Sequence, residues 1–482
     1  LELLSTGRKV FHNLHYRWMG KNHETIWINC RGRVLSDPED GSPRYLVGCI
    51  NEIGAKQKAD NVSGLLGEYS LKIFYESRSP KLPQGFLLRI GIDDFKNINE
   101  SHGNEYGDYI LRRTAQCIEE NIGSEQSLFH IVADEFAVVD FSGGSVQQAE
   151  DLFHEIKKSI YAFIEQNQYK AVYTVSGGIV KNGDVDNSFE NAMKLSEFAL
   201  SEAKERGKNS CYVFEEEEYE DYLKSRTLLR QLHHAVNNGF EGFEAYFQPL
   251  VNAANGELTG AETLLRFHSP EGGMVSPGEF IPILEESGLI IPVGRWVLRQ
   301  ALDACREWQK ILPEFKVNVN LSYVQVLKSR VLTDVRRIVD EFGVKPSSVC
   351  IELTESGYLE ENERFDKVWN GLKEYGVLLA LDDFGTGYSN LRCLSDLKPA
   401  YIKIDRSFTL KALNREYEYR LLNHIVEMSH SLGLHVCVEG IETEGELTKA
   451  KQTEPDYIQG FLFGKPCSRA EFTQKFFTKQ AG

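Results

Sequence analysis

Hydrophobic and polar positions change their pattern twice along the chain. From residue 1 to about 60, apolar runs with strand character, namely "LHYRWMG", "TIWINCRGRVL" and "RYLVGCINEI", are separated by polar turns. From 61 to about 214, strand and helix patterns alternate around a hairpin pattern at 128–141. These patterns predict a three-stranded antiparallel β meander over 1–60 and a layered α/β domain over 61–214.

The last part of the chain alternates strand and helix patterns more regularly. An acidic run opens an amphipathic helix, which predicts a helical connector over 215–240. The segment 241–482 has the length of a (β/α)8 barrel of the TIM type. Its predicted strands lie at 244–251, 258–267, 315–322, 348–355, 377–384, 400–405, 434–442 and 456–463. The expected fold class of the whole chain is therefore multidomain α/β.

From the second strand onward, each predicted barrel strand carries a polar residue within or at the end of its apolar run. In chain order these residues are Glu262, Asn320, Glu352 with Glu355, Asp382 with Asp383, Lys403, Glu439 and Gln459. The C-terminal ends of parallel barrel strands meet on the face where such barrels carry their active sites. So many carboxylates require compensating cations when they are buried together. Carboxylate and amide oxygens suit Mg²⁺ or Mn²⁺ better than zinc, so the pattern predicts a site for such ions.

Composition limits the partners and the compartment. The chain has 54 basic and 71 acidic residues, a formal charge of -17, and no basic footprint for duplex nucleic acid. No apolar run approaches the length of a membrane span, and the nine cysteines are scattered without a CxxC pair. We therefore expect a cytoplasmic protein. Because the sequence does not begin with Met, we also expect further sensor segments before residue 1, and a membrane-attached sensor there stays open.

Seven motifs of the barrel segment resemble those of the EAL cyclic di-GMP phosphodiesterases over about 230–478. They are "ETLLRF" (262–267), "VNVNLS" (317–322), "ELTE" (352–355), "LDDFGTGYS" (381–389), "KIDR" (403–406), "VEGIET" (438–443) and "QGFLFGKP" (459–466). Thr263 replaces the alanine of the signature tripeptide, at a position that is not a ligand. The resemblance implies hydrolysis of cyclic di-GMP to linear pGpG with two Mg²⁺ or Mn²⁺ ions, in a homodimer.

The same resemblance implies roles for individual residues. The implied metal ligands are Glu262, Asn320, Glu352, Asp382, Asp383 and Glu439, and the implied substrate-binding residues are Gln248, Arg266 and Gln459. Glu262 and Glu439 are also expected to be catalytic. Lys403 would orient or deprotonate the attacking water. Glu355 would anchor the glycine-containing loop that, in the family, couples dimerisation to metal binding.

Residues 61–214 resemble the GGDEF diguanylate cyclase domain. The resemblance rests on "DDFKNINESHGNEYGD" (93–108) and "ALSEAKERGKN" (199–209). It implies GTP-binding positions at Asn99, Asp108, Asp134, Lys204 and Lys208.

The cyclase signature itself departs from the family pattern. Val132 and Ala133 replace its two glycines, and Gly91 stands where the family has its first metal-binding carboxylate. Side chains at 132 and 133 occupy space that the substrate needs, because glycine allows close backbone approach. We therefore predict that this domain does not synthesise cyclic di-GMP. Two roles remain open, namely GTP binding that modulates the phosphodiesterase and a purely structural role as a spacer.

Residues 1–60 resemble the C-terminal half of a PAS sensor domain. Two other functions stay open for the whole chain. One is a non-catalytic cyclic di-GMP receptor, and the other is a bifunctional enzyme that also makes cyclic di-GMP.

Overall fold

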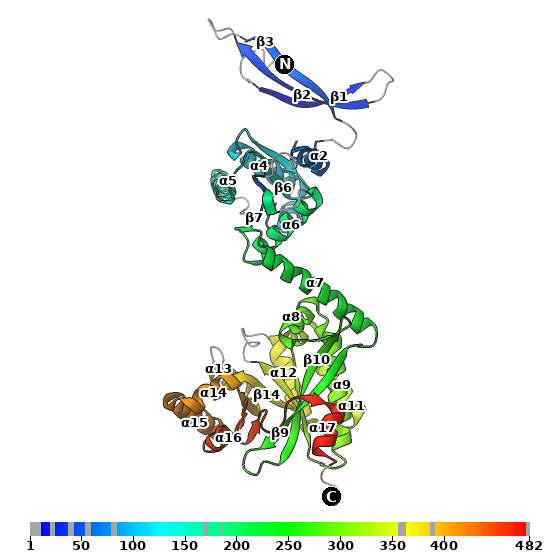
Figure 1. Ribbon diagram of the computed structural model, residues 1–482, viewed down its shortest axis with the longest axis vertical. Helices are drawn as coiled ribbons and strands as arrows, with labels where there is room; N and C mark the ends of the chain where they lie inside the picture. Colours follow the sequence, from blue (N-terminus) through cyan, green and yellow to red (C-terminus); the bar gives the residue numbers. More distant parts are fainter. Residues whose placement is uncertain are drawn as a thin grey trace. The chain divides into compact units, whose positions relative to one another are not determined.

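The computed structural model describes residues 11–19, 25–36, 43–53, 59–78, 84–167, 172–184, 188–354, 363–385 and 391–478. Side chains are described from residue 59 onward, apart from 391–393. The chain divides into two units, Leu1–Asp221 and Tyr222–Gly482, and each is described by itself (Figure 1). None of the helices in the described ranges combines the length and the apolar character that a bilayer crossing requires.

The first strands of the chain form a sheet of their own. Strands β1 (Phe11–Met19), β2 (Thr25–Ser36) and β3 (Pro43–Ile53) pair antiparallel in the order β1-β2-β3. The predicted three-stranded meander is confirmed. Its assignment to a PAS domain stays a prediction.

The rest of the first unit is a five-stranded sheet in the order β5-β6-β4-β7-β8, covered by helices on both faces. Its strands are β4 (Phe86–Ile92), β5 (Gln126–His130), β6 (Glu135–Asp140), β7 (Val175–Lys181) and β8 (Cys211–Val213). Its helices are α2 (Glu68–Arg78), α3 (Phe95–His102), α4 (Asn104–Asn121), α5 (Val146–Gln166) and α6 (Phe189–Glu205). Every residue of β4 is buried, because α4 and α5 pack on one face of the sheet and α2 and α6 on the other.

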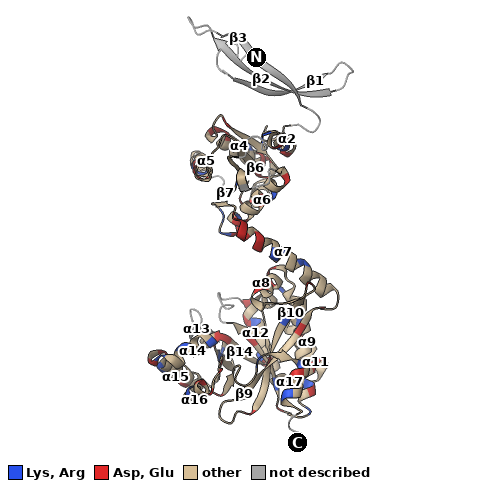
Figure 2. Cartoon of the chain, viewed as in Figure 1, with Lys and Arg blue, Asp and Glu red and all other residues tan. Residues whose placement is uncertain are grey.

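Helix α7 (Glu216–Asn237) is the predicted connector. Its first turn contains Glu216, Glu217 and Glu218, which Figure 2 shows as an acidic start. Negative side chains there stabilise the helix, because unpaired backbone N–H groups give its N-terminus a partial positive charge. Toward its other end, Leu232 and Ala235 are buried in the core of the second unit.

The second unit is a closed eight-stranded barrel, to which β11 (Gly273–Val275) and β18 (Cys467–Ser468) add short edge pairings. The barrel strands are β9 (Phe243–Asn252), β10 (Leu258–Ser269), β12 (Lys316–Asn320), β13 (Val349–Thr354), β14 (Leu378–Phe384), β15 (Tyr401–Ile404), β16 (His435–Val438) and β17 (Tyr457–Gln459). The helices are α8 (Pro277–Ser287), α9 (Ile290–Trp308), α10 (Tyr323–Lys328), α11 (Val331–Phe342), α12 (Glu363–Tyr375), α13 (Leu391–Leu397), α14 (Arg406–Asn414), α15 (Glu416–Ser431), α16 (Glu444–Lys451) and α17 (Arg469–Phe476).

Strand β9 is the exception in an otherwise parallel barrel. It pairs antiparallel with both of its barrel neighbours, β10 and β17. The remaining barrel strands, from β10 and β12 to β17, pair parallel, so their C-terminal ends meet at one end of the barrel. The TIM-like architecture expected from the sequence is thus confirmed, with its first strand reversed.

Candidate active site

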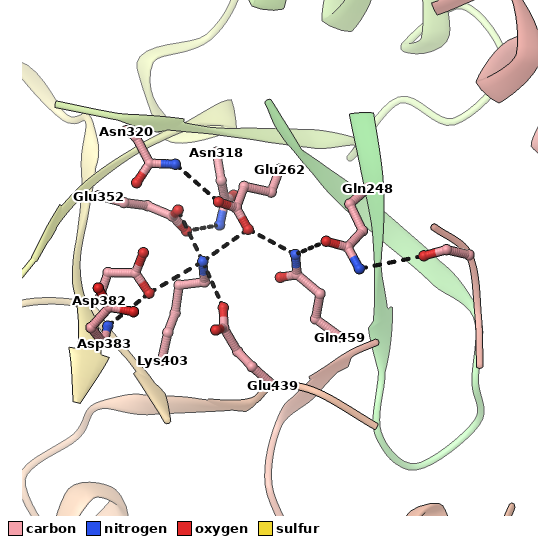
Figure 3. Close-up of polar contacts among 11 residues, drawn as sticks. Gln248, Glu262, Asn318, Asn320, Glu352, Asp382, Asp383, Lys403, Glu439 and Gln459 are labelled. Atoms are coloured by element: carbon pink, nitrogen blue, oxygen red, sulfur yellow. Dashed lines mark hydrogen bonds and ion pairs between the residues drawn. The ribbon is translucent and has the colours of Figure 1, made fainter. Parts of the chain in front are cut away.

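Polar side chains from successive barrel strands meet at the C-terminal end of the barrel (Figure 3). The strand register places these residues at the same height in the barrel. Glu262 on β10 lies opposite Asn318 on β12, and Asn320 lies opposite Glu352 on β13. Lys403 projects from β15, and Glu439 follows the last residue of β16. The convergence predicted from the strand ends is therefore what the structure contains.

Asp382 and Asp383 both line the cavity at this end of the barrel, although they are consecutive residues of β14. Neighbouring residues of a regular strand point to opposite faces. Here the pairing of β14 with β15 shifts register between Leu381 and Phe384, and Asp383 has a left-handed φ of 55°. Such an irregularity re-aims side chains, and it gives the cavity two carboxylates from one strand.

The ammonium of Lys403 is the centre of the cluster. Its Nζ lies 2.8 Å from Glu439 Oε1, 3.0 Å from Glu262 Oε2, 3.0 Å from Glu352 Oε2 and 3.4 Å from Asp382 Oδ1. Lys403 is 2% exposed and Glu352 is fully buried. One buried positive charge thus contacts four carboxylates.

Amide side chains complete the hydrogen bonding of these carboxylates. Asn318 Nδ2 donates to Glu352 Oε1 at 2.7 Å, and Asn320 Nδ2 donates to Glu262 Oε1 at 2.9 Å. Gln459 Nε2 donates to Glu262 Oε2 at 2.7 Å and to Gln248 Oε1 at 3.1 Å. Each amide holds its partner in one orientation, which pre-organises the site.

The pKa values of the cluster are strongly perturbed. Burial raises the pKa of Glu352, and charge repulsion from Glu262 and Asp382 adds to the rise. Burial raises the pKa of Glu439 to about 8. Burial would also raise the pKa of Glu262, but Lys403 and the hydrogen bonds from Gln459 and Asn320 lower it below its usual value. Burial opposes ionisation of Lys403 too, yet the surrounding carboxylates raise its pKa well above the ordinary value.

A cavity of about 240 Å³ opens beside the cluster. Its lining includes Glu262, Asp382, Asp383, Glu439 and Gln459. Gln459 is 4% exposed, and its Oε1 has no hydrogen-bond partner within the described part of the protein. A buried acceptor without a donor costs free energy unless a ligand or water supplies the donor.

The donor set suits hard divalent cations. Glu262, Glu352 and Asp382 each offer an oxygen, and these oxygens lie within 4.8 Å of one another. Several carboxylates around a single ammonium leave an excess of negative charge, which further cations would neutralise. Oxygen ligands of this kind favour Mg²⁺ or Mn²⁺. The residues therefore fit the ions that the sequence implied.

Arg266 is placed differently from the other predicted residues that the structure describes. Arg266 lies over the ring of Tyr246, with its guanidinium carbon 5.5 Å from the ring centroid, and donates to Leu265 O at 2.9 Å. It is not among the described residues that line the cavity. Glu355 and the loop 386–390 lie outside the described residues. Their roles, and the homodimer, stay predictions.

Asn318 is the residue that the sequence analysis missed. It is 7% exposed and bonded to Glu352, so it belongs to the site. A signal was present in "VNVN" (317–320), because residues two apart on a strand share a face and Asn320 had already been placed at the strand end.

In the first unit, fixed cations accompany the two acids of the "VADEF" hairpin. Glu135 is bound by the buried Arg89, whose Nη2 and Nε lie 2.6 Å and 2.7 Å from Glu135 Oε2. A Cβ at Gly91 would lie 2.9 Å from Lys204 Nζ, so this ammonium lies beside the position of the absent carboxylate. Burial raises the pKa of Asp134, and the charge of Lys204 opposes that rise.

These contacts place cations of the chain beside the hairpin acids. Glu135 is already neutralised by a guanidinium, and a lysine lies beside Gly91. Among the described carboxylates, imidazoles and thiols, no set positioned to share an ion includes Asp134 or Glu135. The loss of the cyclase metal site stays a prediction.

The other predicted GTP-binding residues are spread over two places. Lys208 Nζ is paired with Asp94 Oδ2 at 2.7 Å. The side chain of Asn99 on α3 packs against Gly107 of α4, where a Cβ would lie 1.9 Å from Asn99 Oδ1. Asp108 follows on the same helix and is half-buried. Asn99 therefore lies beside the turn of α4 that contains Asp108. Lys208, in contrast, is held in an ion pair with Asp94.

Comparison with known families identifies two successive domains in the chain. The diguanylate cyclase GGDEF domain matches residues 70–210, and the EAL domain matches residues 229–466. The bifunctional diguanylate cyclase/cyclic di-GMP phosphodiesterase MucR of Pseudomonas aeruginosa is 29% identical over 381 residues, which are 79% of this chain and 55% of MucR. The cyclic di-GMP phosphodiesterase PdeR of Escherichia coli is 29% identical over 455 residues, which are 94% of this chain and 67% of PdeR.

Among solved structures, the cAMP-bound form of the EAL enzyme Bd1971 is 30% identical, with a TM-score of 0.50. The match covers 54% of this chain and 72% of that chain. The chain spans about half the length of the first curated relatives that it matches.

Proposed function

Because the chain belongs to the family of proteins that carry a GGDEF domain followed by an EAL domain, we propose that its barrel hydrolyses cyclic di-GMP to linear pGpG. The observation that carries the proposal is the cluster in which Lys403 contacts four carboxylates beside an open cavity. The phosphodiesterase names of PdeR and MucR support it.

The proposed ligands of two Mg²⁺ or Mn²⁺ ions are Glu262, Asn320, Glu352, Asp382, Asp383 and Glu439. Such ions, when bound, lower the pKa of a water molecule and stabilise charge on phosphate oxygens. The chain's own residues hold these ligands in place through Asn318, Lys403 and Gln459. The ligands are thus oriented before substrate arrives, so little reorganisation accompanies the reaction.

Lys403 is best suited to an electrostatic role. Its pKa lies well above the ordinary value because carboxylates surround it, so it carries its proton at neutral pH. A protonated amine cannot accept a proton from water. Of the two roles expected for Lys403, orientation and charge stabilisation are therefore favoured over deprotonation. Gln459 Oε1, which has no donor among the described residues, would accept a hydrogen bond from the attacking water.

We further propose that the GGDEF domain does not make cyclic di-GMP and serves as a structural spacer. Arg89 binds Glu135, Lys204 lies beside Gly91, and Lys208 is paired with Asp94. Glu135, which a metal would need, and Lys208, which a GTP phosphate would need, thus already form ion pairs inside the domain. Titration with GTP distinguishes this role from GTP sensing, since a spacer shows neither binding nor a change in hydrolysis.

The phosphodiesterase proposal is tested with the purified chain, cyclic di-GMP and Mg²⁺ or Mn²⁺. Chromatography should show pGpG accumulating at the expense of substrate. Tight binding without any pGpG would instead identify a non-catalytic receptor. Formation of cyclic di-GMP from GTP would identify a bifunctional enzyme.

A further inference from the structure

Glu285 is an acidic residue in the last turn of α8, a place that the helix itself disfavours. The C-terminal end of a helix carries a partial negative charge, and the last turn of α8 contains no basic residue. Phe280 and Leu284 are fully buried, so this helix is anchored in the core of the second unit. The anchored helix presents the Glu285 carboxylate to a partner outside α8.

That partner is Ser322, which lies two residues after Asn320. Ser322 Oγ donates to Glu285 Oε1 at 2.6 Å, and both residues are half-buried. The same hydroxyl accepts a hydrogen bond from Val324 N–H at 3.2 Å and caps α10. Because a hydroxyl has a single proton, the carboxylate fixes its direction and leaves the oxygen to accept from the helix.

Hydrogen bonds hold the turn from Asn320 to Ser322. The side chain of Asn320 is exposed, so close packing does not fix it. Leu321 N–H donates to Glu352 O at 2.8 Å, and Ser322 N–H donates to Gln325 Oε1 at 3.1 Å. The carboxylate from α8 adds a contact from the helical layer outside the barrel. The turn is thus tied to the barrel, to α10 and to α8.

The orientation of Asn320 decides what it offers to a metal ion. Asn320 Nδ2 donates to Glu262 Oε1 at 2.9 Å, which leaves Asn320 Oδ1 as the amide atom that a cation can use (Figure 3). Groups that orient a metal ligand contribute strongly to metal affinity. We propose that Glu285 is a positioning residue that holds Asn320 in its metal-binding orientation through Ser322, a proposal that rests on the proposed function.

The test is calorimetric titration of the full chain with Mn²⁺ in the absence of substrate. Glu285→Ala removes the acceptor and should weaken Mn²⁺ binding about 10-fold. Glu285→Gln keeps an oxygen that accepts from the Ser322 hydroxyl, so its affinity should stay within about twofold of the wild-type value. Glu286→Ala is the matched control, because Glu286 is the exposed acidic neighbour in the same turn, and its affinity should not change.

A double variant tests the route through Ser322. Ser322→Ala should weaken Mn²⁺ binding as Glu285→Ala does. Glu285→Ala added to Ser322→Ala should cause no further loss, because residues that act through one contact are not additive. Additive losses would overturn the route.

The outcomes separate this inference from the proposed function. Unchanged Mn²⁺ affinity in Glu285→Ala, or equal losses in Glu285→Ala and Glu286→Ala, would overturn the positioning role. A wild-type chain that binds Mn²⁺ but leaves cyclic di-GMP intact would overturn the phosphodiesterase, and the Mn²⁺ titrations would still decide the role of Glu285. In an active chain, saturating Mn²⁺ should return kcat of Glu285→Ala to within about twofold of the wild-type value, and a loss that Mn²⁺ does not reverse would contradict a role in metal affinity.

Discussion

Lys403 Nζ lies 2.8 Å from Glu439 Oε1, and the two residues come from neighbouring strands of the barrel, β15 and the end of β16. Glu439 is in turn surrounded by the charges of Asp382 and Glu262, which help to raise its pKa. Lys403 is therefore the built-in cation of an acidic site. Two consequences can be measured directly, one for stability and one for metal binding.

Lys403→Met should inactivate and destabilise the barrel. The substitution keeps an unbranched side chain, one atom shorter, and removes the charge that four buried carboxylates contact. Loss of one partner from a buried ion cluster costs about 3–5 kcal/mol, and loss of a pre-organised charge lowers kcat about 100-fold or more. Thermal unfolding and hydrolysis assays measure both effects. Lys345→Met, at a position with 73% of its side chain exposed, is the control and should change neither.

Metal binding should release protons near neutral pH. Burial raises the pKa of Glu439 to about 8, and burial together with Asp382 raises the pKa of Asp383 to about 6. Below these values the carboxyl groups are protonated, and a divalent ion must displace the protons because it binds the ionised form. The affinity for Mn²⁺ should therefore weaken as pH falls from about 8 to about 6. Calorimetry in buffers of different ionisation enthalpy measures the released protons, and a pH-independent affinity would contradict the prediction.

Much of this site could be predicted from the sequence, because strand ends in a parallel barrel meet by construction. Glu262, Glu352, Asp382, Lys403 and Glu439 were located in this way, and the structure brings them together. The central position of Lys403 could not be predicted. It depends on the directions in which the side chains point, and the sequence pattern gives only their positions along the strands.

Other features depend on backbone geometry that hydrophobic patterns do not encode. The apolar pattern of β9 has no direction, so its antiparallel pairing was not foreseen. The irregularity in β14 that turns both aspartates into the cavity follows from a register shift with β15. Arg266 was placed by its motif, yet a cation–π contact with Tyr246 sets its position.

Asn318→Leu should weaken metal binding. Asn318 Nδ2 donates to the fully buried Glu352 at 2.7 Å, so the substitution leaves that carboxylate without its amide donor. Removal of a side chain that orients a metal ligand lowers metal affinity or activity by about 10- to 100-fold. Mn²⁺ titration and hydrolysis measure the loss. Asn414→Leu, at an exposed position of α14, is the control, and equal losses in both variants would argue against a positioning role.

Ala133→Gly should stabilise the first unit without restoring a cyclase. Ala133 has a left-handed φ of 51°, a conformation that costs a residue with a Cβ about 1–2 kcal/mol. Glycine relieves this strain, but it also loses more backbone entropy on folding than alanine, which offsets part of the stabilisation. A net stabilisation of up to about 1 kcal/mol is therefore expected in denaturant unfolding. Ala137→Gly, in the buried middle of β6, should have the opposite effect. Synthesis of cyclic di-GMP by Ala133→Gly would refute the role given to Arg89 and Lys204.

The most direct test compares pGpG formation from cyclic di-GMP by two variants of the full chain, Glu262→Gln and Asp134→Asn, in Mn²⁺. Each replaces one carboxylate by an amide of the same shape, the first in the barrel and the second in the hairpin of the GGDEF domain. Chemistry in the barrel predicts that Glu262→Gln forms no pGpG and that Asp134→Asn matches the wild-type rate. A Glu262→Gln variant that keeps wild-type activity, or an Asp134→Asn variant that loses it, would contradict the assignment of the reaction to the barrel.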